Sequence, residues 1–132
     1  YAQELLKTPK RLSPEEIFHL RYAISDIVDD LRAPLSRTEA IATGVQLYPI
    51  LANFFLRSNG CWGANGKWIP RSLHRADSEY AKNFQLAFDQ LFQYGIVSVV
   101  IGLAAETLAP YGGFFFDGYK REAPPDWRIK NR

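Results

Sequence analysis

The fold is decided first by residues 13–32, whose sequence is SPEEIFHLRYAISDIVDDLR. Ser13 can accept hydrogen bonds from the free amides of a helix start, a proline suits the first turn, and Glu16 completes a capping box. Apolar residues then recur at spacings of three and four, which is the period of one helix face. They are Ile17, Leu20, Ile24, Ile27 and Leu31. This pattern predicts an amphipathic helix that ends near Arg32, ahead of Pro34.

The next stretch repeats the same pattern. Ser36 and Glu39 form a second capping box, and a second apolar stripe follows at the same spacing. Its members are Ile41, Val45, Tyr48, Ala52 and Phe55. Pro49 lies inside this helix, where its missing N–H is expected to cause a kink. Asn59 and Gly60 supply a left-handed stop, so we expect a second helix, antiparallel to the first.

The rest of the chain predicts a loop and three more helices. Residues 60–68 contain three glycines and two tryptophans and are expected to form the loop. Residues 70–76 favour a short helix, and Asp77 or Ser78 can cap a longer one that ends at Gly95. Residues 96–108 are apolar almost all round, which predicts the most buried helix.

The predicted fold class is all-α: an antiparallel helical bundle of four to five helices with a glycine- and tryptophan-rich loop and an irregular C-terminal tail. Residues 1–12 are interpreted as a linker or the end of a preceding domain, residues 13–121 as the bundle domain and residues 122–132 as the tail. One hydrophobic core is expected. Its predicted members are Ile24, Ile27, Leu31, Val45, Phe55, Leu91 and Val100.

Composition narrows the class of protein. The chain has 132 residues, of which 47% are apolar, and this suits one compact domain. The formal net charge is only +2, so a charge-driven partner has to meet a local patch. A single cysteine, Cys61, forms neither an internal disulfide nor a cysteine-based metal site, which favours a reducing, cytoplasmic location. The apolar stretch 94–105 is too short to cross a membrane. Because the chain begins at Tyr1 and contains no methionine, we expect a fragment of a longer protein.

An acidic cluster in the first helix is one candidate for binding chemistry. Motifs for phosphate loops, dinucleotide binding, zinc proteases and nucleophile elbows are absent, so no catalytic or metal-binding residue is predicted. Asp26 and Asp30 are four residues apart and share a helix face, with Asp29 beside them. The cluster is interpreted either as a solvated face or as a holder of a substrate amine or hydroxyl.

A basic cluster between residues 57 and 75 is the other candidate. It contains Arg57, Lys67, Arg71 and Arg75 and no acid, and Trp68 lies among these cations. Backbone amides, cations and a flat ring can surround a phosphate or a base. In the alternative interpretation the loop tryptophans pack against the bundle and the cations are solvated.

The two clusters are expected to meet, because opposite charges in a nearly neutral chain are most economically placed side by side. Lys67 and Arg71 would then compensate Asp26 and Asp30 at the mouth of a cleft. The predicted substrate-binding residues are Asp26, Asp30, Arg57, Lys67, Trp68 and Arg71.

Four pieces of the sequence, in this order, carry a resemblance to a known family. They are Arg21-Tyr22 with Ser25-Asp26-x-x-Asp29-Asp30-Leu31, then Leu56-Arg57-x-Asn59-Gly60, then Gly66-Lys67-Trp68-Ile69-Pro70-Arg71, and finally Leu108-Ala109-Pro110-Tyr111-Gly112-Gly113 with Asp117-Gly118-Tyr119. Over roughly residues 14–121 the chain resembles the C-terminal helical domain of a bacterial family of nucleotidyltransferase-fold proteins.

The resemblance implies a division of labour. In such proteins an N-terminal domain similar to the polymerase-beta palm carries a Gly-Ser motif and paired aspartates, which hold magnesium and a nucleoside triphosphate. This chain lacks that Gly-Ser and Asp-x-Asp combination. The resemblance therefore implies a substrate-binding and closing domain that holds no cofactor itself and is inactive alone, similar in architecture to the bundle of aminoglycoside nucleotidyltransferases.

The expected partners follow from this interpretation. They are the N-terminal nucleotidyltransferase domain of the parent chain and a small-molecule or nucleotide substrate, with a second copy of the chain as a further candidate and no membrane. The alternative hypothesis is a non-catalytic helical module that binds another protein.

Overall fold

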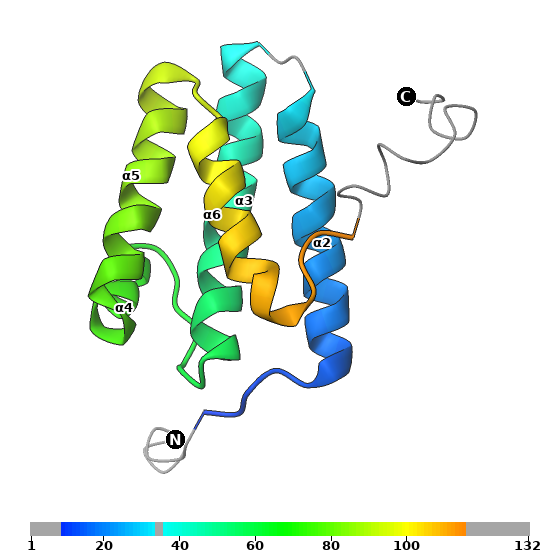
Figure 1. Ribbon diagram of the computed structural model, residues 1–132. Coiled ribbons are helices and arrows are strands. Elements are labelled where there is room, and N and C mark those ends of the chain that lie inside the picture. The colour runs from blue at the N-terminus through cyan, green and yellow to red at the C-terminus, as the bar shows by residue number, and fades with distance from the viewer. Residues whose placement is uncertain (1–8, 34–35, 116–132) are drawn as a thin grey trace, which may run out of the picture.

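The computed structural model describes residues 9–33 and 36–115, which form five α-helices and one 3-10 helix. These are α2 (Pro14–Arg32), α3 (Arg37–Ser58), α4 (Trp68–Ala76), α5 (Ser78–Tyr94), α6 (Ser98–Leu108) and η1 (Ala109–Tyr111). The four longer helices run antiparallel in sequence order, and α4 lies beside the start of α5 (Figure 1). The predicted all-α antiparallel bundle is confirmed. The predicted tail, residues 122–132, lies outside the described residues.

The first two helices begin where the sequence predicts. Ser13 Oγ accepts a hydrogen bond from the Glu16 N–H at 3.1 Å, and Glu16 Oε1 accepts one from the Ser13 N–H at 2.8 Å. These bonds hold the pKa of Glu16 below its ordinary value. Ser36 and Glu39 form the same reciprocal pair at 3.1 and 3.4 Å. Both capping boxes are local, so each satisfies otherwise unpaired amides without help from the rest of the fold.

The core lies between the four longer helices, and one predicted member is wrong. Ile24, Ile27, Leu31, Leu91 and Val100 are buried, and Phe55 is half-buried. Val45, however, is 59% exposed. The buried face of α3 is the stripe one position earlier. It consists of Ala40, Gly44, Leu47, Leu51, Phe54 and Ser58, and Leu56 and Ala52, the latter a member of the predicted stripe, are buried as well.

Gly44 explains this shift. A Cβ atom on Gly44 would overlap Leu91 Cδ2 and lie 3.0 Å from Phe92 Cε1, so α5 crosses α3 at the glycine. Packing at a helix crossing depends on side-chain size as well as polarity. The small residue therefore faces the neighbouring helix, and Val45 is turned outward.

Helix α6 is buried on one side only. Val100, Leu103, Ala104 and Leu108 are in the core, whereas Val99 is 38% exposed. The prediction that this helix is the most buried is thus correct for one face and wrong for the other. None of the helices in the described part of the chain combines the length and apolar character needed to cross a membrane.

Candidate functional site

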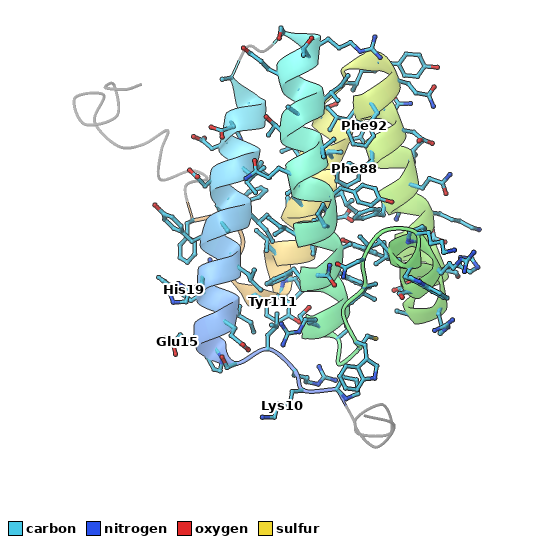
Figure 2. The ribbon with its side chains drawn as sticks, turned by 180° about the vertical axis from the view of Figure 1, so that it is seen from behind. Lys10, Glu15, His19, Phe88, Phe92 and Tyr111 are labelled. Carbon is cyan, nitrogen blue, oxygen red and sulfur yellow. The ribbon has the colours of Figure 1, made fainter. Side chains whose placement is uncertain are left out.

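The structure does not bring the two predicted clusters together. Helix α2, with Asp26 and Asp30, packs against α3 and α6, whereas α4 packs against α3 and α5. The two helices lie on opposite sides of the bundle in both views (Figures 1 and 2). Among the described residues, no ion pair within 4.0 Å joins Lys67 or Arg71 to either aspartate. The expected pairing is wrong because α3 and α6 separate the charges.

The glycine-rich loop, residues 60–67, is fastened to α3. Asn53 Nδ2 donates to the carbonyls of Pro49 and Ala64, both at 2.9 Å, and Asn53 Oδ1 accepts from the Ala64 N–H at 2.7 Å. A Cβ atom on Gly63 would lie 2.7 Å from Asn53 Oδ1, so the close approach needs glycine. One asparagine thus sets the path of the loop and, through it, the start of α4.

An open groove lies where α4 meets α5 and the middle of α3. Its volume is about 1000 Å³. Its uncharged lining is mostly apolar and aromatic: Tyr48, Pro70, Leu73, Ala81, Phe84, Gln85, Phe88 and Phe92. Its titratable or charged lining is Arg71, His74, Arg75, Lys82 and Asp89. We call this the α4–α5 groove.

The aromatic floor of the groove comes from a four-residue repeat on α5. The ring centroids of Phe84 and Phe88 are 4.7 Å apart, and those of Phe88 and Phe92 are 5.8 Å apart. Tyr48 of α3 meets both Phe84 and Phe88 edge-on at 5.0 Å. Figure 2 shows Phe88 and Phe92 on the side of α5 that faces α3. Residues four apart share a helix face, but Phe84 and Phe88 are each only 2% exposed and belong to the core, so the half-buried Tyr48 and Phe92 supply the aromatic surface that reaches the groove.

Two fixed points hold α5 in place beside the groove. Asp77 joins α4 directly to α5, and its Oδ1 accepts hydrogen bonds from two backbone N–H groups in the first turn of α5, at 3.1 and 3.0 Å. At the other end, Arg37 Nη2 donates to the carbonyl of Phe92 at 2.7 Å. The groove is therefore set by contacts at both ends of its longest wall.

A smaller apolar hollow of about 420 Å³ adjoins the groove and shares Tyr48 and Phe92 with it. Its other lining residues are Val45, Pro49, Gly66 and Ile69. The exposed side chain of Val45 forms one wall of this hollow.

The groove is positively charged along α4. Arg71 and Arg75 are four residues apart on that helix, and Lys82 adds a third formal charge from α5. Within the described part of the chain, no carboxylate lies within 4.0 Å of these three cations. Arg71 contacts the half-exposed Trp68 ring, with its Cζ atom 4.9 Å from the centroid. Within the described ranges, three cations without a carboxylate partner thus line the groove.

Asp89 and Tyr48 add a carboxylate and a phenol to the lining of the groove. Burial raises the pKa of the Tyr48 phenol, and the nearby negative charge of Asp89 raises it further. Tyr48 therefore stays a neutral phenol that can both donate and accept a hydrogen bond. Neither residue was predicted as a site residue: Tyr48 was placed only in the apolar stripe of residues 41–55, and Asp89 was not singled out.

The six predicted site residues are thus distributed over four places. Arg71 lines the groove, and the Trp68 ring contacts Arg71. Lys67 is exposed and is not among the groove-lining residues. Arg57 is half-buried near Gly63, with its Cδ atom 3.8 Å from the position of a Cβ there. Asp26 and Asp30 lie on α2, away from the groove.

Arg21 has a structural role that the sequence did not reveal. Its Nε and Nη2 atoms donate to the carbonyl of Gly113 at 3.0 and 2.9 Å, and its Cζ atom lies 4.1 Å from the centroid of the Phe115 ring. The Phe115 N–H donates to Ser25 Oγ at 3.0 Å. A Cβ on Gly112 would lie 2.8 Å from Arg21 Nη2. The first and last pieces of the family resemblance therefore meet and fasten residues 112–115 to α2.

No family model, curated protein or solved structure matches the chain. Among the residues that the structure describes, no three His, Cys, Asp or Glu side chains are grouped so that they could hold a metal ion. The α4–α5 groove is therefore the feature from which function is inferred.

Proposed function

We propose that this domain is the substrate-binding domain of a nucleotidyltransferase-type protein and that the α4–α5 groove receives an anionic small molecule or nucleotide. The observation that carries the proposal is an aromatic floor beside three cations that lack an ion-pair partner among the described residues. Small-molecule sites are typically apolar clefts of about 300–1000 Å³ with a few polar groups that fix orientation. The groove has this size and composition.

The residues divide the binding task between them. Arg71 and Arg75 offer planar guanidinium groups that suit phosphate or carboxylate oxygens, and Lys82 adds a point charge from the facing helix. The half-buried rings of Tyr48 and Phe92 offer edge or stacking contacts to a flat ligand, above the buried Phe84 and Phe88. The groove thus combines charge recognition with an apolar surface.

The family resemblance supports the same location. Its third piece, residues 66–71, contributes Gly66 and Ile69 to the smaller hollow and Pro70 and Arg71 to the groove. In the proposed protein the magnesium ion and nucleoside triphosphate belong to the N-terminal domain. This domain's own part is to bind and orient the substrate.

Binding of inorganic pyrophosphate, measured by isothermal titration calorimetry, tests the proposal. Replacing Arg71 and Arg75 together (R71Q/R75Q) is expected to weaken binding about tenfold or more, because one hydrogen bond to a charged group contributes about 1.5–3 kcal/mol and about 1.4 kcal/mol is a factor of ten. Lys67→Gln is the matched control, since Lys67 is on the same segment outside the lining. Equal losses in the two variants, or no binding by the original chain, would contradict the groove assignment.

The chain alone is expected to have no nucleotidyl-transfer activity, because the resemblance assigns the magnesium carboxylates to the partner domain. A pyrophosphate-release assay with nucleoside triphosphates and magnesium measures this directly. Release that exceeds a heat-denatured control would mean that the chemistry resides in this domain.

A second candidate function, a helical protein-interaction module, is favoured by a different observation. Leu86 is 54% exposed and Val99 is 38% exposed, and both line a hollow of about 340 Å³ between α5 and α6. Exposed apolar side chains that gather on one face are typical of protein contact surfaces. Sedimentation velocity compares the original chain with Leu86→Glu: concentration-dependent dimers that this variant abolishes would favour the module, and a monomer in both cases would count against self-association.

A further inference from the structure

The smaller hollow beside the α4–α5 groove differs from the groove because no charged side chain lines it. Its volume of about 420 Å³ falls in the range of small-molecule sites. Its lining combines an exposed valine, two half-buried rings, a proline and a glycine with a buried isoleucine: Val45, Tyr48, Phe92, Pro49, Gly66 and Ile69. The Tyr48 phenol is the one polar side-chain group among these six residues. The hollow therefore offers an apolar surface to whatever enters it.

Two of the walls of the smaller hollow are open to solvent. Val45 is among the most exposed large apolar side chains of the described residues. A Cβ atom on Gly66 would meet no heavy atom within 4 Å, so the space beside this glycine is empty. Leaving apolar walls in contact with water is unfavourable, and an apolar group that covers them removes that cost.

The start of α4 joins the smaller hollow to the cations. Ile69 lines the hollow, and the next two residues, Pro70 and Arg71, line the groove. The Cζ atom of Arg71 lies 4.9 Å from the ring centroid of Trp68, the first residue of α4, so the charge is held at this end of the helix. Arg75 follows one turn later. A positive charge thus stands directly beside an uncharged apolar hollow.

We propose that the smaller hollow is a hydrocarbon-binding subsite of the groove and that the ligand is a free phosphate monoester of an apolar alcohol. Arg71 and Arg75 hold the phosphate, and the hydrocarbon group lies in the hollow against Val45 and Phe92. This inference rests on the proposed function, because it assigns a substrate class to the same site.

The two ends of this ligand are recognised by different interactions. The guanidinium groups match the geometry of phosphate oxygens, whereas the hydrocarbon group gains by leaving water. Asp89, the one acid among the groove-lining residues given above, lies three residues before Phe92 on α5. Its negative charge disfavours a second anionic group at that end of the ligand. The site therefore favours a ligand with one anionic and one apolar end over a ligand that is anionic at both.

The test compares methyl phosphate, hexyl phosphate and hexylammonium by isothermal titration calorimetry. The original chain is expected to bind hexyl phosphate at least about tenfold more tightly than methyl phosphate, because burial of about two methylene groups corresponds to that factor. Hexylammonium has the same chain and the opposite charge, so it should bind much more weakly than hexyl phosphate. Arg71→Gln should weaken both phosphates by about the same factor.

Val45→Asn is expected to remove most of the preference for hexyl over methyl phosphate and to leave methyl phosphate binding unchanged, because it places a polar amide in the wall of the hollow. Val99→Asn is the matched control, an exposed valine on α6 outside this hollow, and should retain the preference. A preference lost in Val99→Asn and kept in Val45→Asn would place the hydrocarbon between α5 and α6 and overturn the inference.

Further outcomes separate this inference from the proposed function. Equal binding of methyl and hexyl phosphate, or equal binding of hexyl phosphate and hexylammonium, overturns the subsite while pyrophosphate binding still supports the groove. Cosedimentation with phosphatidic acid vesicles is not expected, because the chains of a bilayer lipid are already buried; cosedimentation that Val45→Asn abolishes would overturn the assignment to a free ester. Failure of both alkyl phosphates and of pyrophosphate to bind overturns the proposed function together with the subsite.

Discussion

Two arginines that each contact an aromatic ring are used differently on the two sides of the bundle. Arg21 on α2 is half-buried, lies over Phe115 and donates two hydrogen bonds to the carbonyl of Gly113. Arg71 on α4 is exposed and lies over Trp68, and it forms no hydrogen bond or ion pair with a described residue. The guanidinium group of Arg21 therefore stabilises the fold, whereas that of Arg71 bonds to no described residue. An arginine's partners, more than its place in a motif, distinguish a structural role from a binding role.

The largest expected effect on stability is the difference between a core residue, Leu31, and Val45, which lines the hollow beside the groove. Leu31→Ala should lower the free energy of unfolding by about 2–5 kcal/mol, because it removes a fully packed side chain. Val45→Ala should cost no more than about 0.5 kcal/mol, as for most exposed positions. Urea denaturation measures both. If Val45→Ala lowers the free energy of unfolding as much as Leu31→Ala does, Val45 is packed in the core and its assignment to the groove side is wrong.

The next effect compares the two arginines themselves. Arg21→Gln should lower the free energy of unfolding by about 1–3 kcal/mol, since it leaves a partly buried carbonyl without its charged donor. Arg71→Gln should change it by no more than about 0.5 kcal/mol. Parallel urea titrations of the two variants give the difference. If both arginines contribute equally to stability, the contrast between the two sides is wrong.

A smaller effect concerns the hydroxyl that anchors one end of the aromatic row. Tyr80 is stacked on Phe55, and its O–H lies 2.7 Å from Thr107 Oγ1, which itself donates to a backbone carbonyl. Tyr80→Phe should therefore cost about 0.5–1.5 kcal/mol near neutral pH. Thermal or urea unfolding at neutral pH measures this, and no measurable cost would mean that the bond adds nothing.

The same tyrosine makes stability depend on alkaline pH. Burial raises the pKa of Tyr80 well above its ordinary value. In the unfolded chain the phenol ionises near pH 10, while in the fold it keeps its proton. The unfolded state then binds fewer protons, so stability is full below about pH 10 and falls as the pH rises above it. Tyr80→Phe should show a shallower alkaline fall in urea midpoints than the original chain, and an identical fall would contradict the burial of the phenol.

The sequence predicted the local elements of this fold well, for a physical reason. Each capping box satisfies its own amides within three residues, so Ser13 and Ser36 mark helix starts whatever surrounds them. The face of α3 was not predictable in the same way. Hydrophobicity favours Val45 over Gly44, but the crossing with Leu91 is decided by size, and that depends on where α5 lies.

The candidate site was predicted in part. Arg71 and Trp68 could be singled out because the cations and tryptophans lie close together in one short segment of the sequence. The expected contact with Asp26 failed because charge balance says nothing about topology, and the bundle places other helices between the two clusters. Asp89 and Tyr48 come from different helices and line the same groove only when α3 and α5 pack together.

One measurement tests the central claim that the α4–α5 groove, and not the acidic face of α2, is the binding site. Backbone amide chemical shifts of the ¹⁵N-labelled chain are followed during titration with adenosine 5′-monophosphate. The groove assignment predicts saturable shifts at the groove-lining residues, which include Tyr48, Arg71, Arg75, Lys82, Asp89 and Phe92, while Asp26 and Asp30 stay unchanged. Shifts centred on α2 or on the exposed face of α5 and α6, or no saturable shift at all, would contradict it.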